Sequence, residues 1–265
     1  MAGKAYSRNA ASSGRRRGVT GGARRGRSGS PRGPLRRLGA AVGWLLVLAV
    51  TAVLALQAWY FGHVLWWSQV DPGSTAFMRA ELERLRKKDP DASIDFRWVP
   101  YEAISDNLKR AVIASEDARF TTHGGVDWSA IEAAFERNAE RGRVVFGGST
   151  ITMQLAKNLF LSGDRSYLRK AQEVLIAWML EAVMSKRRIL EIYLNVAEWG
   201  QGVFGAEAAA RHHYRVSAKD LGPAQAARLA AMLPRPRYYD RNPGSGVLER
   251  RAALVQRWMR DVTPP

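Results

Sequence analysis

The chain has 265 residues, a formal net charge of +17 and no cysteine. The lack of cysteine excludes a thiolate nucleophile, a disulfide framework and cysteine-ligated zinc or iron–sulfur sites, and it is compatible with an extracytoplasmic domain. The charge is uneven, because residues 1–37 contain eleven Lys or Arg side chains and no acidic one. This segment is rich in Gly and Ser and has almost no large apolar side chains, so we predict a disordered basic cytoplasmic tail.

The basic tail would attract any polyanion, but it lacks interleaved aromatic residues and a folded groove. We therefore expect it to set topology and contact anionic lipid rather than to bind a specific nucleic acid.

An uncharged stretch of 23 residues, Leu38 to Tyr60, follows the tail. This is enough helix to cross a hydrocarbon core of about 30 Å. Aromatic residues follow it, as in an interfacial belt, where a secretory signal peptide would have a cleavage site. We predict an uncleaved transmembrane helix at residues 38–61 of a single-pass protein of the cytoplasmic (inner) membrane. Because positive charge stays on the cytoplasmic side, the rest of the chain is expected on the periplasmic, extracytoplasmic face.

Residues 62–100 are charged and interrupted by proline, which predicts a membrane-proximal connector with one short helix at 76–88. From residue 105 the apolar spacing is helical, and no alternating β-branched run competes with it. We expect helices at 105–116, 127–141, 150–160, 166–185, 186–195, 205–214, from 218 or 223 to 233, and at 246–261. The predicted fold class is mainly α, with a single transmembrane helix before one helical domain at residues 101–265.

Glu116 ends the first helix of this domain and continues an apolar stripe, because Leu108 and Val112 stand eight and four positions before it. A carboxyl group that is removed from water has a raised pKa, which suits it to exchange a proton near neutral pH. The alternative is a helix-end carboxylate that pairs with Arg119 or caps the next turn.

The segment GGSTITMQLAKN at 147–158 predicts a helix capped by Ser149 or Thr150. The two glycines before the cap allow backbone N–H groups to approach an anion. Polar side chains share one face of this helix: Thr150, Gln154, Lys157 and Asn158. This face either meets a ligand or is simply solvated.

Arg169 and Lys170 stand four and three positions before Glu173, so local ion pairs are expected. The residues VLIAWML that follow Glu173 are apolar nearly all round, which predicts a buried segment. Four aromatic residues are expected in the core: Trp178, Tyr193, Trp199 and Phe204. Two further acids, Glu181 and Glu191, are expected to be structural.

The sequence gives little support to a metalloprotease or a serine hydrolase. The histidines show no H-E-x-x-H spacing, and His212 and His213 are neighbours that are expected to point to different sides of a helix. No G-x-S-x-G sequence is present, and Ser149 precedes a helix.

Four motifs stand in order along residues 101–236: Glu116-Asp117 with Phe120 and His123-Gly124; GGSTITMQLAKN; Arg169-Lys170 with Glu173; and KRRILEIYLN at 186–195. Together they resemble the peptidoglycan glycosyltransferases (glycosyltransferase family 51). Because no extension of transpeptidase size is present, the chain resembles the monofunctional, membrane-anchored form.

The resemblance implies a lysozyme-like helical domain that joins lipid II units to a growing glycan strand through β-1,4 bonds and releases undecaprenyl pyrophosphate. It implies Glu116 as general base and Glu173 as the second catalytic acid. It implies these substrate-binding residues: Asp117, Ser149, Thr150, Gln154, Lys157, Arg165, Arg169 and Lys170. Glu173 would either hold a divalent cation, Mg or Mn, or position the cationic side chains, and no organic cofactor is implied. Other cell-wall synthesis proteins are possible partners.

Two alternatives share parts of this pattern. A lysozyme-like peptidoglycan hydrolase or lytic transglycosylase would need a single catalytic glutamate, but it would have less reason to keep four cations and a membrane span. A non-catalytic membrane scaffold would tolerate an apolar residue in place of Glu116.

Overall fold

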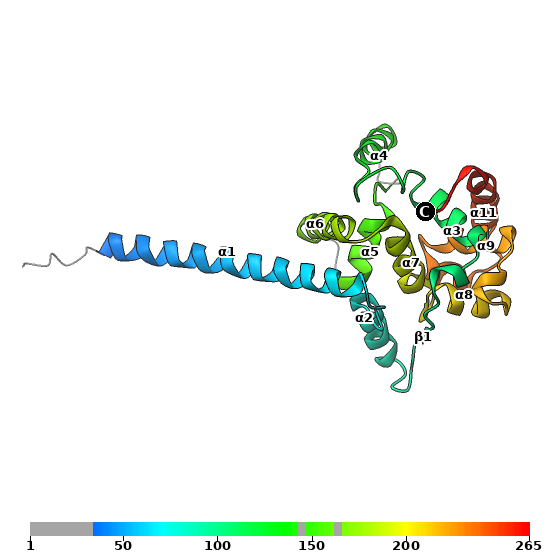
Figure 1. Ribbon diagram of the computed structural model, residues 1–265, viewed down its shortest axis with the longest axis horizontal. Coiled ribbons are helices and arrows are strands. Elements are labelled where there is room, and N and C mark those ends of the chain that lie inside the picture. The colour runs from blue at the N-terminus through cyan, green and yellow to red at the C-terminus, as the bar shows by residue number, and fades with distance from the viewer. Residues whose placement is uncertain (1–33, 143–146, 162–165) are drawn as a thin grey trace, which may run out of the picture. The chain divides into compact units, whose positions relative to one another are not determined.

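The computed structural model describes residues 34–142, 147–161 and 166–265. The chain divides into two compact units, Met1–Thr51 and Ala52–Pro265. The fold is mainly helical, and helix α1 (Pro34–Trp67) is the first element (Figure 1). Its stretch Leu38–Trp67 is long and apolar enough to cross a membrane. The predicted transmembrane helix is therefore confirmed, whereas residues 1–33 of the predicted tail lie outside the described residues.

The last turns of α1 belong to the second unit and pack inside it. Tyr60 and Val64 are buried in its core, and the rings of Tyr60 and Trp67 lie 5.2 and 5.0 Å from the ring of Phe160. Trp59 and Trp66 remain exposed. Of the aromatic residues predicted as an interfacial belt, Tyr60 and Trp67 therefore contact Phe160 within the second unit instead of pointing away from it.

The helices of the second unit agree closely with the predicted ranges. They are α2 (Ala76–Arg86), α3 (Asp106–Glu116), α4 (Trp128–Glu140), α5 (Ile151–Phe160), α6 (Tyr167–Val183), α7 (Lys186–Val196), α8 (Ala206–Tyr214), α9 (Pro223–Met232), α10 (Pro236–Arg241) and α11 (Gly246–Trp258). Short 3-10 turns lie at Tyr101–Ala103, Ala218–Asp220 and Met259–Asp261. Side-chain caps begin several of these helices, at Ser105, Asp127, Thr150, Ser166 and Ser185.

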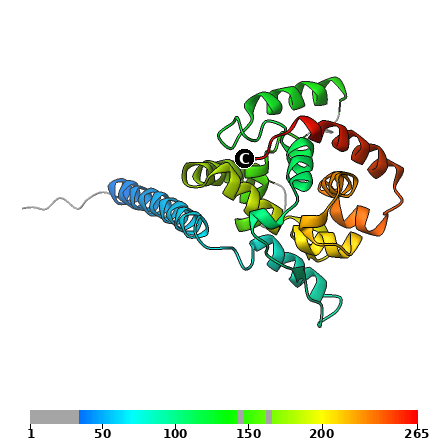
Figure 2. The ribbon, with the colours of Figure 1, turned by 45° about the vertical axis from the view of Figure 1, so that its right-hand side comes forward.

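The core forms where α5 packs against α2, α6 and α7, and where α9 packs against α3 and α11 (Figures 1 and 2). Tyr193, Trp199 and Phe204 are fully buried, as expected. Trp178 is 45% exposed and Leu175 40%, so the prediction that the segment VLIAWML is buried and that Trp178 lies in the core is wrong at these two residues. Apolar residues occur all round α6, but the rest of the domain packs against only one side of this helix.

The sequence pattern did not indicate the small three-stranded sheet. Its strands β1 (Asp95–Phe96), β2 (Glu198–Gly200) and β3 (Val203–Phe204) stand in the order β1-β3-β2, with β3 parallel to β1 and antiparallel to β2. Strands of two or three residues are too short to show an alternation. Gly205 ends this sheet at φ +86°, where an added Cβ would lie 2.6 Å from the carbonyl oxygen of Asn195.

Candidate active site

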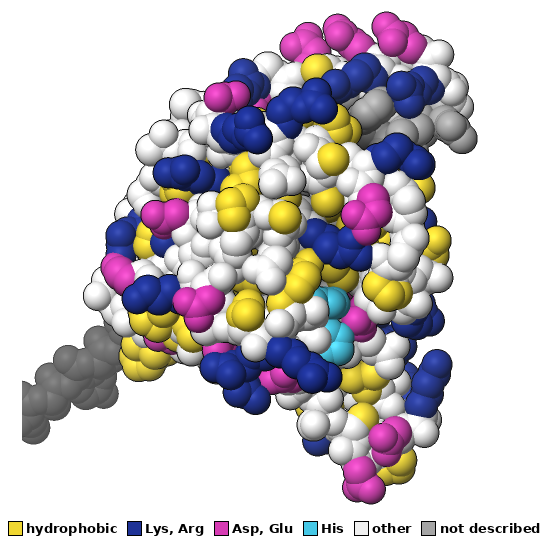
Figure 3. Space-filling view, turned by 90° about the vertical axis from the view of Figure 1, so that its right-hand side faces the viewer, with side chains coloured by type: hydrophobic (Ala, Val, Ile, Leu, Met, Phe, Trp, Pro, Cys, Tyr) yellow, Lys and Arg dark blue, Asp and Glu magenta, His cyan; other side chains and the backbone are white. Residues whose placement is uncertain are grey.

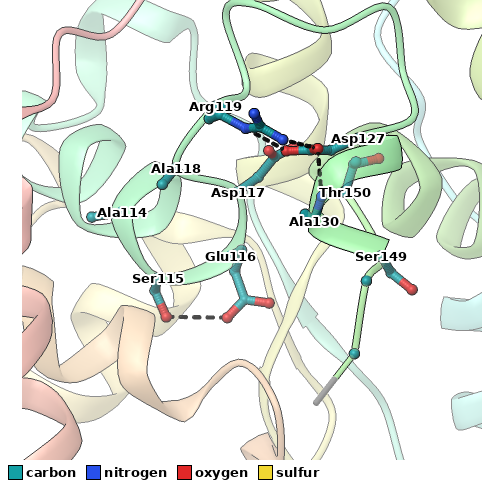
Figure 4. A pocket seen from close by; sticks show the side chains of 12 residues that line it. Ala114, Ser115, Glu116, Asp117, Ala118, Arg119, Asp127, Ala130, Ser149 and Thr150 are labelled. Carbon is teal, nitrogen blue, oxygen red and sulfur yellow. Dashed lines mark hydrogen bonds and ion pairs between the residues drawn. The ribbon is translucent and has the colours of Figure 1, made fainter. Parts of the chain in front are cut away.

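A cavity of about 260 Å³ opens between the end of α3 and the segment that leads into α5. Glu116, Asp117 and Arg119 line one side, and residues 147–150 line the other (Figure 4). A second cavity, of about 200 Å³, lies farther along α5, where Gln154, Lys157 and Asn158 meet Tyr193 and Glu198. The polar face of α5 therefore lines cavities rather than open solvent.

Glu116 stands at the C-terminal end of α3, on the stripe that the sequence predicts. Leu108 and Val112 are fully buried, and the Glu116 side chain is 10% exposed. Its Oε1 accepts a hydrogen bond from Ser115 Oγ at 3.1 Å, and its Oε2 accepts one from Gln154 Nε2 at 3.0 Å. The alternative pairing with Arg119 is not formed, because Arg119 pairs with Asp127 instead. Glu116 is thus an acid that is held by neutral donors at the edge of a cavity.

Asp117 joins the end of α3 to the start of α5. Its carboxylate accepts hydrogen bonds from the backbone N–H of Ile151 at 3.0 Å and from His123 Nε2 at 2.9 Å. The side chain is buried, so these bonds form away from bulk water and are costly to break. Asp117 therefore fixes the distance between Glu116 and the helix that carries Gln154.

Thr150 is the N-cap of α5, whereas the sequence left the cap open between Ser149 and Thr150. Its hydroxyl accepts from Met153 N and donates to the carbonyl oxygen of Gly125 at 2.6 Å. Ser149 does not cap the helix, and its Oγ accepts a hydrogen bond from Lys170 Nζ at 2.7 Å. The start of α5 is therefore linked to the cationic start of α6.

Gln154 lies between the two cavities and is fixed at both ends. Its Nε2 donates to Glu116, and its Oε1 accepts from the hydroxyl of Tyr193 at 3.0 Å. Burial raises the pKa of Tyr193 well above 10.0, and the charges of Glu116 and Asp117 raise it further. Tyr193 is consequently a neutral donor that orients Gln154, a role that sequence reasoning missed when it placed Tyr193 only in the core.

Lys157 is the cation of the second cavity. Burial lowers its pKa below 10.5, an effect that the charge of Glu173 opposes. In the part of the chain that the structure describes, no carboxylate lies within ion-pair distance of its ammonium group. A half-buried ammonium group without a close counter-ion is a ready partner for an anionic ligand.

Arg169 and Lys170 begin α6 and both pair with Glu173, with Lys170 Nζ at 2.9 Å from Oε2. Glu173 is 4% exposed. The expected local ion pairs are thus present, and they hold a buried carboxylate rather than a solvated one. Arg165, the fourth predicted cation, lies outside the described residues.

Glu181 and Glu191 are hydrogen-bonded within the fold, as expected for structural acids. Glu181 accepts from Thr152 Oγ1 at 2.6 Å and from Lys186 Nζ at 2.8 Å. Glu191 accepts from the backbone N–H of Tyr101 at 2.9 Å and from Arg188 at 2.7 Å.

Two further charged residues reach the cavities from distant parts of the chain. Arg251 of α11 lies 3.6 Å from Glu116 Oε1, and Glu198 of β2 lines the cavity of Lys157. Burial raises the pKa of Glu198, while its pair with Arg237 opposes the rise. Sequence spacing could not find either residue, since only tertiary packing brings α11 and β2 to these positions.

The donor set around Glu173 does not fit a divalent cation. Both of its oxygens accept from cations, Arg169 and Lys170. Two groups of possible metal ligands occur among the described residues, and neither includes Glu173. One of them, Asp117 with His123 and Asp127, already binds the guanidinium group of Arg119 through Asp127, and this positive charge would repel a metal ion. The geometry favours the other predicted role of Glu173, which is to position the cations.

Comparisons with known proteins show the family of this chain. A family model described as Transglycosylase matches residues 83–260. The chain is 59% identical over 222 residues to a protein of Janthinobacterium sp. (strain Marseille), a match that covers 84% of this chain and 96% of the relative. It is 61% identical over 225 residues to one of Bordetella pertussis, covering 83% and 93%. It is 56% identical over 225 residues to one of Thiobacillus denitrificans, covering 84% and 97%. Each relative is named biosynthetic peptidoglycan transglycosylase.

Proposed function

The chain belongs to the transglycosylase family, the peptidoglycan glycosyltransferases, and from this membership we propose that it polymerises lipid II into glycan strands. In this reaction the 4-hydroxyl of an acceptor sugar attacks the anomeric carbon of the donor, and undecaprenyl pyrophosphate leaves. Inversion of an α-linked donor gives a β-1,4 bond. The observation that carries the proposal is an acid, Glu116, in one cavity and a cation, Lys157, in the other, which has no ion pair among the described residues. Gln154 links the two cavities, since it lines the second and donates a hydrogen bond to Glu116 in the first.

Glu116 acts as the general base in this proposal. Its carboxylate lines the larger of the two cavities, accepts hydrogen bonds from the neutral groups of Ser115 and Gln154, and lies 3.6 Å from the guanidinium group of Arg251. A carboxylate held in this way keeps its orientation when it accepts a proton. Asp117 supports this geometry through Ile151 N and His123.

In this proposal the cationic side chains at α5 and α6 bind the leaving pyrophosphate. Lys157, Arg169 and Lys170 provide three positive charges, and Glu173 neutralises one of them, which leaves an excess of two. Positive groups aimed at a leaving group stabilise the charge that develops on it in the transition state. Ser149, Thr150 and Gln154 orient the substrate, and Arg165 is expected to add a fourth cation.

The membrane span places this chemistry beside its substrate. Lipid II carries a polyprenyl chain that stays in the bilayer, so an anchored enzyme meets it at the membrane surface. The positive charge of residues 1–37 keeps the N-terminus in the cytoplasm and the catalytic unit outside the inner membrane. This orientation is part of the proposal.

Incubation of the purified full chain with lipid II in detergent tests the proposed reaction. We expect lipid II to be consumed, undecaprenyl pyrophosphate to be released and a β-1,4 glycan to form, with product sizes read by gel or chromatography. Finished peptidoglycan should stay insoluble. Solubilisation of finished peptidoglycan with lipid II left intact would instead assign a hydrolase or lytic transglycosylase, and no reaction with either substrate would assign a scaffold.

Arg251 offers a test of the surroundings of Glu116. Replacement of Arg251 by Gln removes the positive charge 3.6 Å from the carboxylate. We expect the rate of polymerisation to fall by about fivefold or less, because partly exposed ion pairs contribute about 1 kcal/mol or less.

The neighbouring exposed residue provides the control for this change, because Arg250→Gln removes the same charge on the outer side of α11. An equal fall in the rate of both variants would show that only the net charge matters. An Arg251→Gln rate that matches the wild type would show that Arg251 does not contribute to the site.

A further inference from the structure

A cluster of metal-ligand side chains lies away from the active-site cavities, at the end of α8. One ring nitrogen of His212, one of His213 and a carboxylate oxygen of Asp240 lie within 4.8 Å of one another. Figure 3 shows histidine side chains at the surface next to an acidic side chain, on the face of the domain that carries α8, α9 and α11. Asp240 comes from α10, so two helices contribute to the cluster.

The two histidines converge, which corrects the expectation that they point to different sides of α8. Their ring centroids lie 4.6 Å apart with an interplanar angle of 87°. Successive side chains leave a helix about 100° apart, but the imidazole rings are long enough to bend back toward each other at the last turn. His212 Nε2 then reaches Asp240 Oδ1 at 2.8 Å.

Backbone groups already orient the remaining atoms of the cluster. His213 Nε2 lies 3.0 Å from the carbonyl oxygen of Trp199; this oxygen only accepts, so Nε2 carries the hydrogen and Nδ1 keeps a free lone pair. The second carboxylate oxygen of Asp240 accepts from the backbone N–H of Gln201 at 3.0 Å. Metal-binding histidines and carboxylates are commonly fixed by hydrogen bonds of this kind. The nearby cation Arg228 pairs with Glu249, which reduces its repulsion toward a bound ion.

We propose that His212, His213 and Asp240 form a surface site for zinc or a similar divalent transition metal. Two imidazole nitrogens and one carboxylate oxygen are a common ligand set for zinc, with water in the fourth position. The ion would replace the hydrogen bond between His212 and Asp240 and would fasten α8 to α10. The site is separate from the proposed catalysis, since none of its three residues lines either active-site cavity.

The consequence concerns α10. This helix carries Arg237, which pairs with Glu198 at 2.6 Å and with Glu81 at 2.7 Å, and its first residue, Pro236, lines the cavity of Lys157. An ion held at Asp240 would therefore stabilise one wall of that cavity without contacting a substrate.

Zinc binding to the tag-free full chain in detergent tests the proposal. After treatment with a chelator, the wild type should bind one zinc ion per chain, as measured by competition with a zinc-sensitive dye. His212→Ala should bind at least about tenfold more weakly, since even loss of an outer hydrogen bond costs that much at a metal site. His212 is exposed, so this change should leave the fold and the metal-free activity intact.

His63→Ala is the matched control, because it removes a histidine of α1 that lies outside the cluster. It should bind zinc as the wild type does, and Asp240→Asn should bind as weakly as His212→Ala. The absence of saturable binding to the wild type would overturn the proposal, and so would equal binding by the wild type and His212→Ala.

Discussion

Replacement of Glu116 by Gln should slow glycan polymerisation at least about a hundredfold, the lower range of a lost general base. The change retains size and hydrogen-bonding capacity but removes the group that takes the acceptor proton. Because Ser115 and Gln154 bond to the side chain, an amide at this position can keep one of the two contacts, and the fold should persist. The measurement is the initial rate of lipid II consumption in detergent.

A binding measurement distinguishes the loss of the general base from the loss of the substrate-binding site. The Glu116→Gln variant should still bind lipid II or a phosphoglycolipid inhibitor, and its melting temperature should stay close to that of the wild type. Glu102→Gln, which changes an exposed carboxylate outside both cavities, is the matched control and should be fully active. Ordinary polymerase activity of Glu116→Gln would show that another group, or water, accepts the proton.

The position of Glu116 could be predicted because it depends on local periodicity. A helix that buries Leu108 and Val112 must present position 116 on the same stripe, whatever the rest of the chain does. The caps Thr150 and Ser166 are local for the same reason, since each hydroxyl accepts a hydrogen bond from an N–H three residues later. Helix stripes and N-caps depend on only a few neighbouring residues, so they can be predicted from the sequence.

The remaining features depend on contacts between distant segments. Arg251 reaches Glu116 only because α11 packs against α9 and α3. Helix α10 begins at Pro236 shortly after Pro234, a composition that is typical of a loop. The exposure of Trp178 depends on which side of α6 the lobe covers. None of these contacts has a periodic signal in the sequence.

The cation that should be most sensitive to substitution is Lys157, because no carboxylate of the described residues lies within ion-pair distance of its ammonium group. Arg169 and Lys170 share Glu173, and removal of either would leave a buried acid with one partner fewer. Lys157→Met leaves no such acid behind, so it should not lower the melting temperature. It should slow polymerisation by more than tenfold, the effect of losing a charge-assisted contact of about 1.5 to 3 kcal/mol.

The pH dependence gives the same test a second measurement. Since the pKa of Lys157 is lowered by burial, its positive charge is lost at a lower pH than that of a free lysine. The wild type should therefore lose activity on the alkaline side before pH reaches 10.5, and Lys157→Arg should keep activity to higher pH, because a guanidinium group stays protonated. Arg250→Met, on the exposed side of α11, is the control for loss of a positive charge. Equal rates for Lys157→Met, Arg250→Met and the wild type would show that the pyrophosphate does not contact Lys157, and the cation cluster at the start of α6 would then have to stabilise the leaving group alone.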